Sequence, residues 1–237
     1  MLFLQFAQMS LTRFIQVYIV QGIYGLFYIY MALMILKKDR KKLNRLLSGF
    51  YLSAGIAVII NIIYVSITVE LIVRAFHFTV YFLFCFALCF ILLFILTLSK
   101  SEDIITVSRQ SIIMIVYCIL LLFLLIIPNG FEISAGTNWV PVWNPLFLLY
   151  ASIICICLMI IPSLFYALLL LRKFENEDLK KKWKYFIIGI SSYFFVWAIT
   201  SISNTLNVAS FRSITAILTV LTIPSIYLIY YGVLKQL

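Results

Sequence analysis

The sequence predicts an all-α membrane protein, a polytopic bundle of seven transmembrane helices. First, 65% of its 237 residues are hydrophobic and only 11% are charged, whereas soluble domains average about 45–50% apolar and about 25% charged residues. Second, long apolar runs recur along the whole chain, each close to the roughly 20 residues that cross about 30 Å of hydrocarbon as a helix. Third, most basic residues gather in two short blocks between these runs, as membrane topology signals do. A soluble globular protein is therefore excluded.

Seven apolar runs can be placed, and together they form a single transmembrane domain over residues 1–237. Their approximate bounds are 14–36, 46–68, 75–98, 111–128, 146–171, 185–203 and 213–234. The fourth run is the shortest and the fifth is the longest, so we expect the fifth helix to tilt or to project into the cytoplasm. No run shows the alternating polarity of β-barrel strands.

Local signals justify the boundaries of these runs. The basic block "KKDRKKLNR" separates the first run from the second, "VELIVRAFHFTVYF" leads into the third, and "TLSKSED" stands between the third and the fourth. The fifth run begins at Pro145, which fits a first helical turn, with Asn144 as a candidate cap. The segment "RKFENEDLKKKWK" has an acidic start and a basic finish, which suggests helical extensions of the fifth and sixth runs. Arg212 opens the seventh run.

The basic residues also predict how the chain crosses the membrane. The loops after the first and fifth runs carry six basic residues each, and with Lys100, Arg109 and Lys235 they place fifteen of the 18 lysines and arginines on one side. The positive-inside rule puts this side in the cytoplasm. We therefore expect an outside N-terminus and a cytoplasmic C-terminus in the cell membrane. Four spans between the two basic loops return both to one face, which supports the count of seven.

Composition and motifs argue against several other classes of protein. The net charge of +10 resides mostly in the two loops rather than on a folded basic surface, so we expect no nucleic-acid partner. The five cysteines all lie inside apolar runs, and Cys85 and Cys89 are expected to be packed thiols rather than metal ligands. One histidine, no paired intramembrane carboxylates, no phosphate-binding glycine loop and no nucleophile elbow favour a protein without catalytic residues, metal or cofactor.

A stripe of polar residues leads into the third run. Helical periodicity places Glu70, Arg74, His77 and Tyr81 on one face. Glu70 and Arg74 have the favourable order for a helical ion pair, and the histidine beside them could contact a ligand or sense pH. Two interpretations remain open: an ion pair at the membrane interface with snorkelling side chains, or an outward-facing binding site.

Other polar and aromatic residues gather at the outer ends of the runs. Trp197 near the end of the sixth run and Arg212 are further candidate ligand contacts. In "TNWVPVWNP", Pro141 disfavours helix, and an extended chain would point Trp139 and Trp143 to the same side. These tryptophans either anchor the segment in the headgroup layer or form an aromatic lid over Glu70, Arg74 and His77.

Polar residues within the spans are few. Gln16, Gln21 and Asn61 are the main ones in the first two runs, and no carboxylate lies well inside any run. Two similar segments, "MIIPSLFYALLLLRK" and "LTIPSIYLIYYGVLK", each carry a Pro-Ser pair in which the serine is expected to satisfy backbone groups freed by the proline. Such paired kinks suggest a hinge or internal repeats, as in some small transporters.

The cytoplasmic loops are candidate contacts for a partner or for anionic lipid. Their basic side chains attract lipid headgroups and could equally bind a cytoplasmic signalling protein. These candidates are Lys37, Lys38, Arg40, Lys41, Lys42, Lys180, Lys181, Lys182 and Lys184.

Three features together resemble a known family. These are the order of the spans, the basic first and third inner loops, and the stretch "KKKWKYFIIGISSYFF", in which basic residues lead directly into an apolar helix with an early glycine, Gly189. They resemble the seven-transmembrane sensor region of prokaryotic histidine kinases and related signalling proteins. The resemblance implies a receptor or sensor for a small molecule or a membrane state. Only "KQL" follows the last run, without an output domain, so we expect the signal to pass to a separate protein.

Two other functions remain open from the sequence. The repeated Pro-Ser segments suggest a small solute transporter, although such carriers need a polar site near the middle of the membrane. A non-catalytic subunit or scaffold of a membrane complex is the third alternative.

Overall fold

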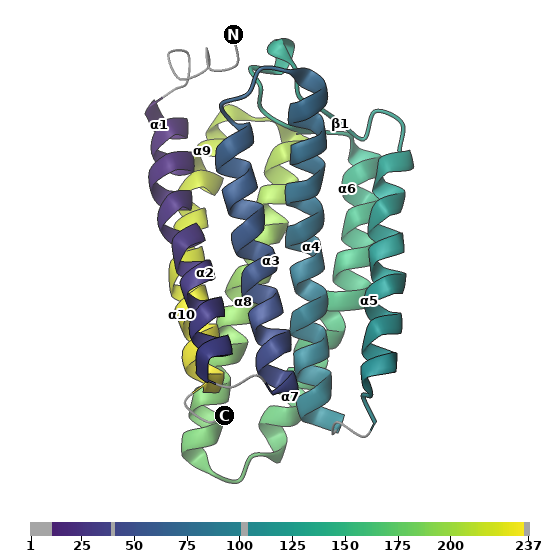
Figure 1. Cartoon of the computed structure of the whole chain (residues 1–237). Coiled ribbons are helices and arrows are strands. Elements are labelled where there is room, and N and C mark those ends of the chain that lie inside the picture. Colours follow the sequence, from purple (N-terminus) through teal and green to yellow (C-terminus); the bar gives the residue numbers. More distant parts are fainter. Residues whose placement is uncertain (1–10, 39–40, 101–103, 235–237) are drawn as a thin grey trace.

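The computed structural model describes residues 11–38, 41–100 and 104–234, which form a bundle of parallel and antiparallel helices (Figure 1). Arg40 and Lys235, two of the basic residues counted above, lie outside the described residues. Within the described residues seven helices are long and apolar enough to cross a membrane: Ile15–Lys38, Lys42–Tyr64, Glu70–Lys100, Val107–Ile126, Pro145–Lys173, Glu177–Leu206 and Ala209–Val233. The prediction of a polytopic helical protein with seven spans is confirmed.

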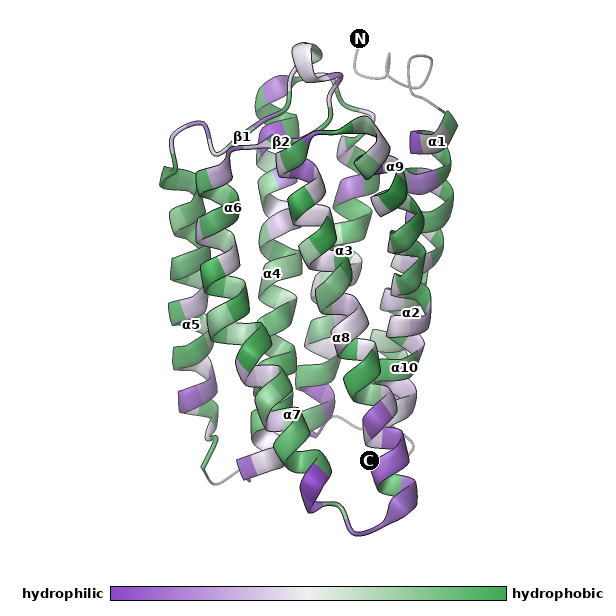
Figure 2. Ribbon diagram, turned by 180° about the vertical axis from the view of Figure 1, so that it is seen from behind, coloured by the Kyte–Doolittle hydropathy of each residue, from purple (hydrophilic) through white to green (hydrophobic). Residues whose placement is uncertain are grey.

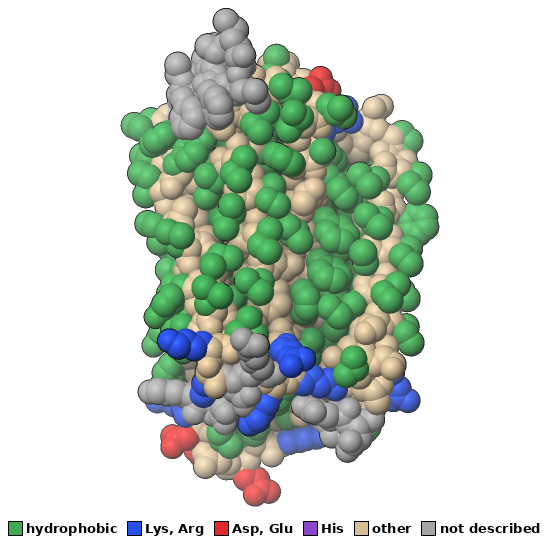
Figure 3. All heavy atoms as spheres, in the orientation of Figure 1, with side chains coloured by type: hydrophobic (Ala, Val, Ile, Leu, Met, Phe, Trp, Pro, Cys, Tyr) green, Lys and Arg blue, Asp and Glu red, His purple; other side chains and the backbone are tan. Residues whose placement is uncertain are grey.

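The two ends of the bundle carry different segments. We call the end at the top of Figure 1 the upper end; it holds the short connections 65–69 and 207–208 and the longer segment 127–144. The lower end holds Lys37, Lys38, Lys41 and Lys42 and the basic segment 172–184. Between the two ends the ribbon is mostly hydrophobic (Figure 2), and on the face shown in Figure 3 the basic side chains gather at the lower end. A belt of exposed apolar side chains around the middle matches a lipid environment.

Three spans change helix type along their length. The first consists of α1 (Leu11–Phe14), a π-helical segment (Ile15–Val20) and α2 (Gln21–Lys38). The fifth consists of α6 (Pro145–Ser152), a π-helical segment (Ile153–Ile160) and α7 (Ile161–Lys173). The seventh consists of α9 (Ala209–Leu218), a 3₁₀ turn (Thr219–Leu221) and α10 (Thr222–Leu234). The other spans are α3 (Lys42–Tyr64), α4 (Glu70–Lys100), α5 (Val107–Leu122) followed by a 3₁₀ turn (Phe123–Ile126), and α8 (Glu177–Leu206).

The relative lengths of the spans differ from the prediction. The fourth is the shortest with 20 residues, as predicted, but α4 with 31 and α8 with 30 are longer than the fifth span with 29. Both helices begin before their apolar runs, α4 at Glu70 and α8 with a polar turn that starts at Glu177. In α8 the Asn176 side chain accepts from the backbone N–H groups of Asp178 (2.9 Å) and Leu179 (3.1 Å), which caps the helix. Hydropathy does not register such polar turns.

The predicted start of α6 is confirmed. The Asn144 side chain accepts a hydrogen bond of 2.8 Å from the backbone N–H of Leu146, and Pro145 occupies the first turn. Proline is tolerated there because that N–H has no partner within the helix. The segment 127–144 is therefore joined rigidly to the fifth span.

The two Pro-Ser pairs are not equivalent. Pro162 follows a π-helical segment, whereas Pro224 follows a 3₁₀ turn. The Ser225 hydroxyl donates to the carbonyl of Leu221 (2.7 Å), but the buried Ser163 hydroxyl has no hydrogen-bond partner among the described residues. The expectation that both serines satisfy the backbone is wrong for Ser163, and the two segments differ where internal repeats would match.

Glycine allows α8 and α10 to pack backbone against backbone. A Cβ atom on Gly232 would lie 2.6 Å from the backbone nitrogen of Phe186, and one on Gly189 would lie 2.8 Å from that of Ile229. Small residues at such positions are the usual means by which membrane helices approach closely. The early glycine singled out in the sequence, Gly189, is therefore a packing residue between the sixth and seventh spans.

Candidate functional site

Residues 127–144 form a cap at the upper end of the bundle. The strands β1 (Phe131–Glu132) and β2 (Val142–Trp143) pair antiparallel, with Phe131 opposite Trp143. Two consecutive residues between the strands, Asn138 (φ 51°) and Trp139 (φ 57°), adopt the left-handed conformation. Asparagine tolerates this conformation, but a bulky residue rarely does. The sharp turn at Trp139 is held by its N–H, which donates to the carbonyl of Ser134 (2.9 Å).

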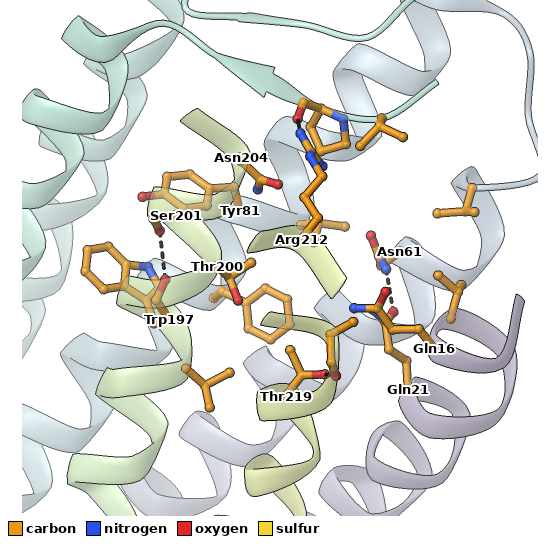
Figure 4. A pocket seen from close by; sticks show the side chains of 18 of the residues that line it. Gln16, Gln21, Asn61, Tyr81, Trp197, Thr200, Ser201, Asn204, Arg212 and Thr219 are labelled. Carbon is orange, nitrogen blue, oxygen red and sulfur yellow. Dashed lines mark hydrogen bonds between the residues drawn. The ribbon is translucent and has the colours of Figure 1, made fainter. Parts of the chain in front are cut away.

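A cavity of about 490 Å³ lies below the cap, and we call it the upper cavity (Figure 4). Its walls come from the first span, the upper ends of α3, α4 and α8, the cap, and the seventh span from α9 to the start of α10. Its volume falls within the range of roughly 300–1,000 Å³ that is usual for small-molecule sites. Five of the seven spans thus meet around one space.

The lower wall of the upper cavity is aromatic. Tyr28 and Tyr193 line the cavity, and both pack against Phe50, which is fully buried beneath them, at ring-centroid distances of 6.2 Å and 5.1 Å. Tyr51 adds a fourth ring next to Tyr28 and Phe50. We call Tyr28, Phe50, Tyr51 and Tyr193 the aromatic floor. Because these rings are packed against one another, the floor separates the cavity from the lower half of the bundle.

Hydrogen bonds tie the aromatic floor to neighbouring helices. The Tyr51 hydroxyl donates to the carbonyl of Ile226 in α10 (2.8 Å), and the Tyr193 hydroxyl donates to the carbonyl of Phe84 in α4 (3.2 Å). Through these hydrogen bonds, a displacement of the aromatic floor would also displace α4, α8 and α10.

Amide side chains form one wall of the upper cavity. Gln16, Gln21 and Asn61 lie on the first span and α3, and the Asn61 amide donates to the Gln21 side-chain oxygen (Figure 4). Uncharged amides offer both donors and acceptors to a ligand. The facing wall carries hydroxyl and amide groups from α8 and the seventh span, namely Thr200, Ser201, Asn204, Ser213 and Thr219.

Two arginines lie at the top of the cavity, directly below the cap. Arg13 donates to the carbonyls of Asn138 (3.0 Å) and Trp139 (2.7 Å), and Arg212 donates to the carbonyl of Pro141 (2.6 Å). The Nε atom of Arg212 is buried without a hydrogen-bond partner among the described residues. Among the described residues no aspartate or glutamate lines the upper cavity.

His77 lies buried between the cap and α3. Its Nε2 accepts from the indole N–H of Trp143 (3.1 Å), and its Nδ1 lies 2.9 Å from the Tyr64 hydroxyl. An indole N–H can only donate, so Nε2 must be unprotonated and a neutral imidazole carries its proton on Nδ1. The arrangement favours a neutral His77 that pins β2 of the cap to α4.

The predicted stripe on α4 is divided between two spaces. His77 and Tyr81 line the upper cavity, whereas Glu70 and Arg74 line a separate, smaller cavity together with Asn129 and Glu132. The indole of Trp143 lines both cavities and stands between them. Glu70 and Arg74 form an exposed ion pair of 3.4 Å, as their order predicted. His77 and this ion pair therefore line different cavities, although Phe131 of the cap packs against both His77 (5.1 Å between ring centroids) and the Arg74 guanidinium (6.0 Å).

The two tryptophans of the cap do not act as a pair. Trp143 is buried, with its ring against Tyr81 (4.6 Å) and Phe147 (5.1 Å). Trp139 instead packs, half-buried, on the cluster that contains Tyr64 and Ile133. The expectation that both point to the same side of an extended chain is wrong, because the left-handed turn at Trp139 rotates its side chain away. Trp143 lines the upper cavity and Trp139 does not, and an aromatic lid over Glu70, Arg74 and His77 stays a prediction.

The remaining predicted contacts fall in two places. Trp197 lines the upper cavity with its indole nitrogen buried and unpartnered among the described residues, and Arg212 lines it as described above. The lysines of the lower end form a second group: Lys42 donates to the carbonyl of Ile105 (2.6 Å), and Lys180 pairs with Glu177 (3.1 Å). Lys37, Lys38, Lys41, Lys181 and Lys184 are exposed, and Lys182 is half-buried.

Sequence reasoning missed part of the site. Arg13 entered only as a count in the charge balance, and Gln16, Gln21 and Asn61 only as isolated polar residues. A signal was present, because Gln16 and Gln21 are polar interruptions of an apolar run, and such residues in spans normally face a cavity or a neighbouring helix. Their meeting with Arg212, almost 200 residues away, depends on the closure of the bundle.

No protein-family model matches this chain, and no curated protein shows significant similarity to it.

Proposed function

We propose that this protein is an integral membrane sensor or receptor-like protein that binds a small ligand in the upper cavity and signals through a separate cytoplasmic protein. The observation that carries the proposal is the upper cavity itself, about 490 Å³ in volume, lined by Trp143 of the cap and by two tyrosines of the aromatic floor. The cavity lies in the upper half of the bundle and the lower half is filled by side chains. This arrangement suits the binding of a ligand that enters from the upper end.

The proposal places the upper end outside the cell and the lower end in the cytoplasm. Its support is the charge asymmetry, fifteen of 18 basic residues being in segments of the lower side. In this orientation the cavity faces the exterior, and the lysines of the lower end face a cytoplasmic partner or anionic lipid. The resemblance of the sequence to the sensor regions of prokaryotic histidine kinases also supports a sensor role.

The aromatic floor offers a route from ligand to partner. A ligand that displaces Tyr28 or Tyr193 acts on α10 and α4 through the hydrogen bonds of Tyr51 and Tyr193. At the lower end of α8, Trp183 stacks on Phe186 (4.5 Å) and donates to the carbonyl of Ala167 (2.8 Å), so α8 and α7 would move together. Coupling of this kind requires a structural element that has two arrangements, and the bound ligand must shift the equilibrium between them.

A sensor is favoured over a transporter. A carrier of this size needs a polar site near the membrane middle between related repeats, whereas the middle of this bundle is occupied by the aromatic floor and the two Pro-Ser segments differ in structure.

Thermal unfolding in lipid nanodiscs tests ligand binding by the upper cavity. A panel of small neutral, acidic and basic organic compounds is screened for a saturable rise in the melting temperature. We expect at least one compound to stabilise the wild type and to lose its effect in Thr200→Trp, which fills the cavity. Ile202→Trp is the matched control, because Ile202 lies on the same helix with its side chain exposed on the outer surface.

Two results would count against the proposal. One is a panel without any stabilising compound; the other is stabilisation that persists in Thr200→Trp. If proteoliposomes took up more of the stabilising compound than empty vesicles do, the result would favour a transporter over a sensor.

A further inference from the structure

We propose that the upper cavity is built for an organic carboxylate, whose anionic head binds Arg13 and Arg212 below the cap and whose apolar body extends towards the aromatic floor. This inference rests on the proposed function and names the class of its ligand.

The charge of the cavity is the first step. Two guanidinium groups line it, both donating to backbone carbonyls within residues 138–141 of the cap, and no carboxylate of the described residues lines it with them. Glu70 and Glu132 line the smaller cavity, which shares only Trp143 with the upper cavity. Both arginines are half-buried, and a charged group that loses part of its water is stabilised by a ligand of opposite charge. The cavity therefore selects an anion over a neutral or cationic molecule.

The partners of the arginines are the second step. Both side chains donate to backbone carbonyls of the cap, and Arg212 in addition keeps a buried Nε donor without a partner among the described residues. A carbonyl is a weaker partner for guanidinium than a carboxylate, which accepts two parallel hydrogen bonds. An anionic head between these arginines would lie directly beneath residues 138–141.

The rest of the lining fixes the character of the ligand's body. Away from the arginines the walls are largely apolar or aromatic, with Val80, Phe84 and Val196 above the tyrosines of the floor. An inorganic anion alone would leave these surfaces uncovered, whereas an aliphatic or aryl chain would cover them. The amides and hydroxyls of the side walls can bind one polar group along that chain.

A matched set of compounds tests the charge. Radiolabelled 4-phenylbutanoate is titrated against the protein in nanodiscs of zwitterionic lipid, with empty nanodiscs as background, and is displaced by octanoate, 4-phenylbutan-1-ol and 4-phenylbutylamine. We expect saturable binding that octanoate displaces and that the alcohol and the amine displace at least about tenfold less well, because a hydrogen bond to a charged group is lost.

Variants test the two arginines. Arg212→Gln and Arg13→Gln are each expected to weaken binding at least about tenfold, while Arg212→Lys retains part of the affinity because it keeps the charge. Arg74→Gln is the matched control, since Arg74 lies at the same end but lines only the smaller cavity. Unchanged melting temperatures show that the variants are folded. If Arg212→Gln does not fold, the Arg13→Gln variant and the displacement series still test whether the cavity binds a carboxylate.

The outcomes separate this inference from the function on which it rests. Equal displacement by the alcohol, or full affinity in both glutamine variants, would overturn the carboxylate and leave a ligand-binding cavity. If a neutral or cationic compound from the wider panel binds and no acid does, the carboxylate is likewise overturned and the ligand-binding cavity remains. No ligand of any charge would overturn both. A third arm uses nanodiscs with phosphatidylglycerol: retained binding supports a free acid, whereas complete loss would mean that a lipid headgroup occupies the site.

Discussion

At the scale of single residues, the contact between His77 and Trp143 joins the cap to the bundle. The imidazole is buried and accepts the indole hydrogen bond, so protonation of Nε2 would place two donors face to face. His77 is thereby held as a neutral acceptor, and its role in the cap is structural as well as lining the upper cavity. Whether it also touches a ligand stays a prediction.

Trp143→Phe tests this contact. The phenyl ring keeps most of the packing against Tyr81 and Phe147, but the buried Nε2 of His77 loses its donor. We expect the free energy of unfolding to fall by about 1–3 kcal/mol, the usual cost of an unsatisfied buried polar group. Unfolding in a denaturing-detergent titration measures it. Trp139→Phe is the control, because the substitution keeps the backbone carbonyl of Trp139 that accepts from Arg13. An equal loss in both variants would contradict a specific role for the Trp143 indole hydrogen bond.

The α4 stripe shows how far residue patterns reach. Helical periodicity placed Glu70, Arg74, His77 and Tyr81 on one face of a helix, and the ion pair followed from the spacing. It could not predict that Trp143 divides the stripe between two cavities, because this depends on a cap folded by residues about 60 positions further along the chain. The neighbours of a buried group come from tertiary structure, which a local pattern does not contain.

At the scale of elements, the contact of α8 with α10 depends on the absence of two side chains. Gly232 faces the backbone of α8, with Phe186 N and the carbonyl of Lys182 at 2.6 Å and 2.8 Å from the position of a Cβ atom. Backbone atoms cannot rotate away as a side chain can, so any larger residue must separate the two helices.

Gly232→Ala is therefore expected to destabilise the protein by about 1–3 kcal/mol, the usual range for overpacking. Gly22→Ala is a matched control, since a Cβ atom there would meet nothing within 4 Å. Because alanine is the better helix former, this variant should be neutral or more stable by up to about 1 kcal/mol. Both free energies of unfolding come from the same detergent titration, and an equal effect of the two alanines would refute the close approach of α8 and α10.

The spans themselves were the part of the structure most open to prediction. Apolar length alone located seven helices, because a helix is one of the few structures that satisfy its backbone in lipid. Apolar length did not predict the start of α4 at Glu70, the polar first turn of α8, or the π-helical and 3₁₀ segments of the first, fifth and seventh spans. Hydropathy does not distinguish one helical hydrogen-bond pattern from another.

At the scale of the whole molecule, the bundle has a divided interior. Its upper half surrounds the upper cavity, and its lower half is filled by large buried side chains such as Phe94, Trp183 and Phe186. No sequence pattern predicts that one half holds a cavity and the other is filled, since both halves are apolar and rich in aromatic residues. It arises because Gln16, Gln21, Asn61 and the two arginines face the same space from three spans.

The orientation of the bundle is the prediction on which the proposed function depends most. Gly136 in the cap and Glu175 between α7 and α8 are exposed at opposite ends of the bundle, so cysteine at each position reports which end faces outward. A cysteine at position 136 meets only the Ser134 hydroxyl at 3.5 Å and leaves the cap intact. Intact cells are treated with a membrane-impermeant maleimide, before and after permeabilisation, and compared with the wild type as the background from its own cysteines.

We expect Gly136→Cys to react in intact cells and Glu175→Cys only after permeabilisation, because lysines and arginines are retained on the cytoplasmic side. The reverse pattern would place the upper cavity in the cytoplasm and its two arginines beyond the reach of an external ligand. Binding of a carboxylate would then report an intracellular compound, and the basic end would face outward. The labelling experiment thus decides the direction of signalling independently of whether the cavity binds a ligand.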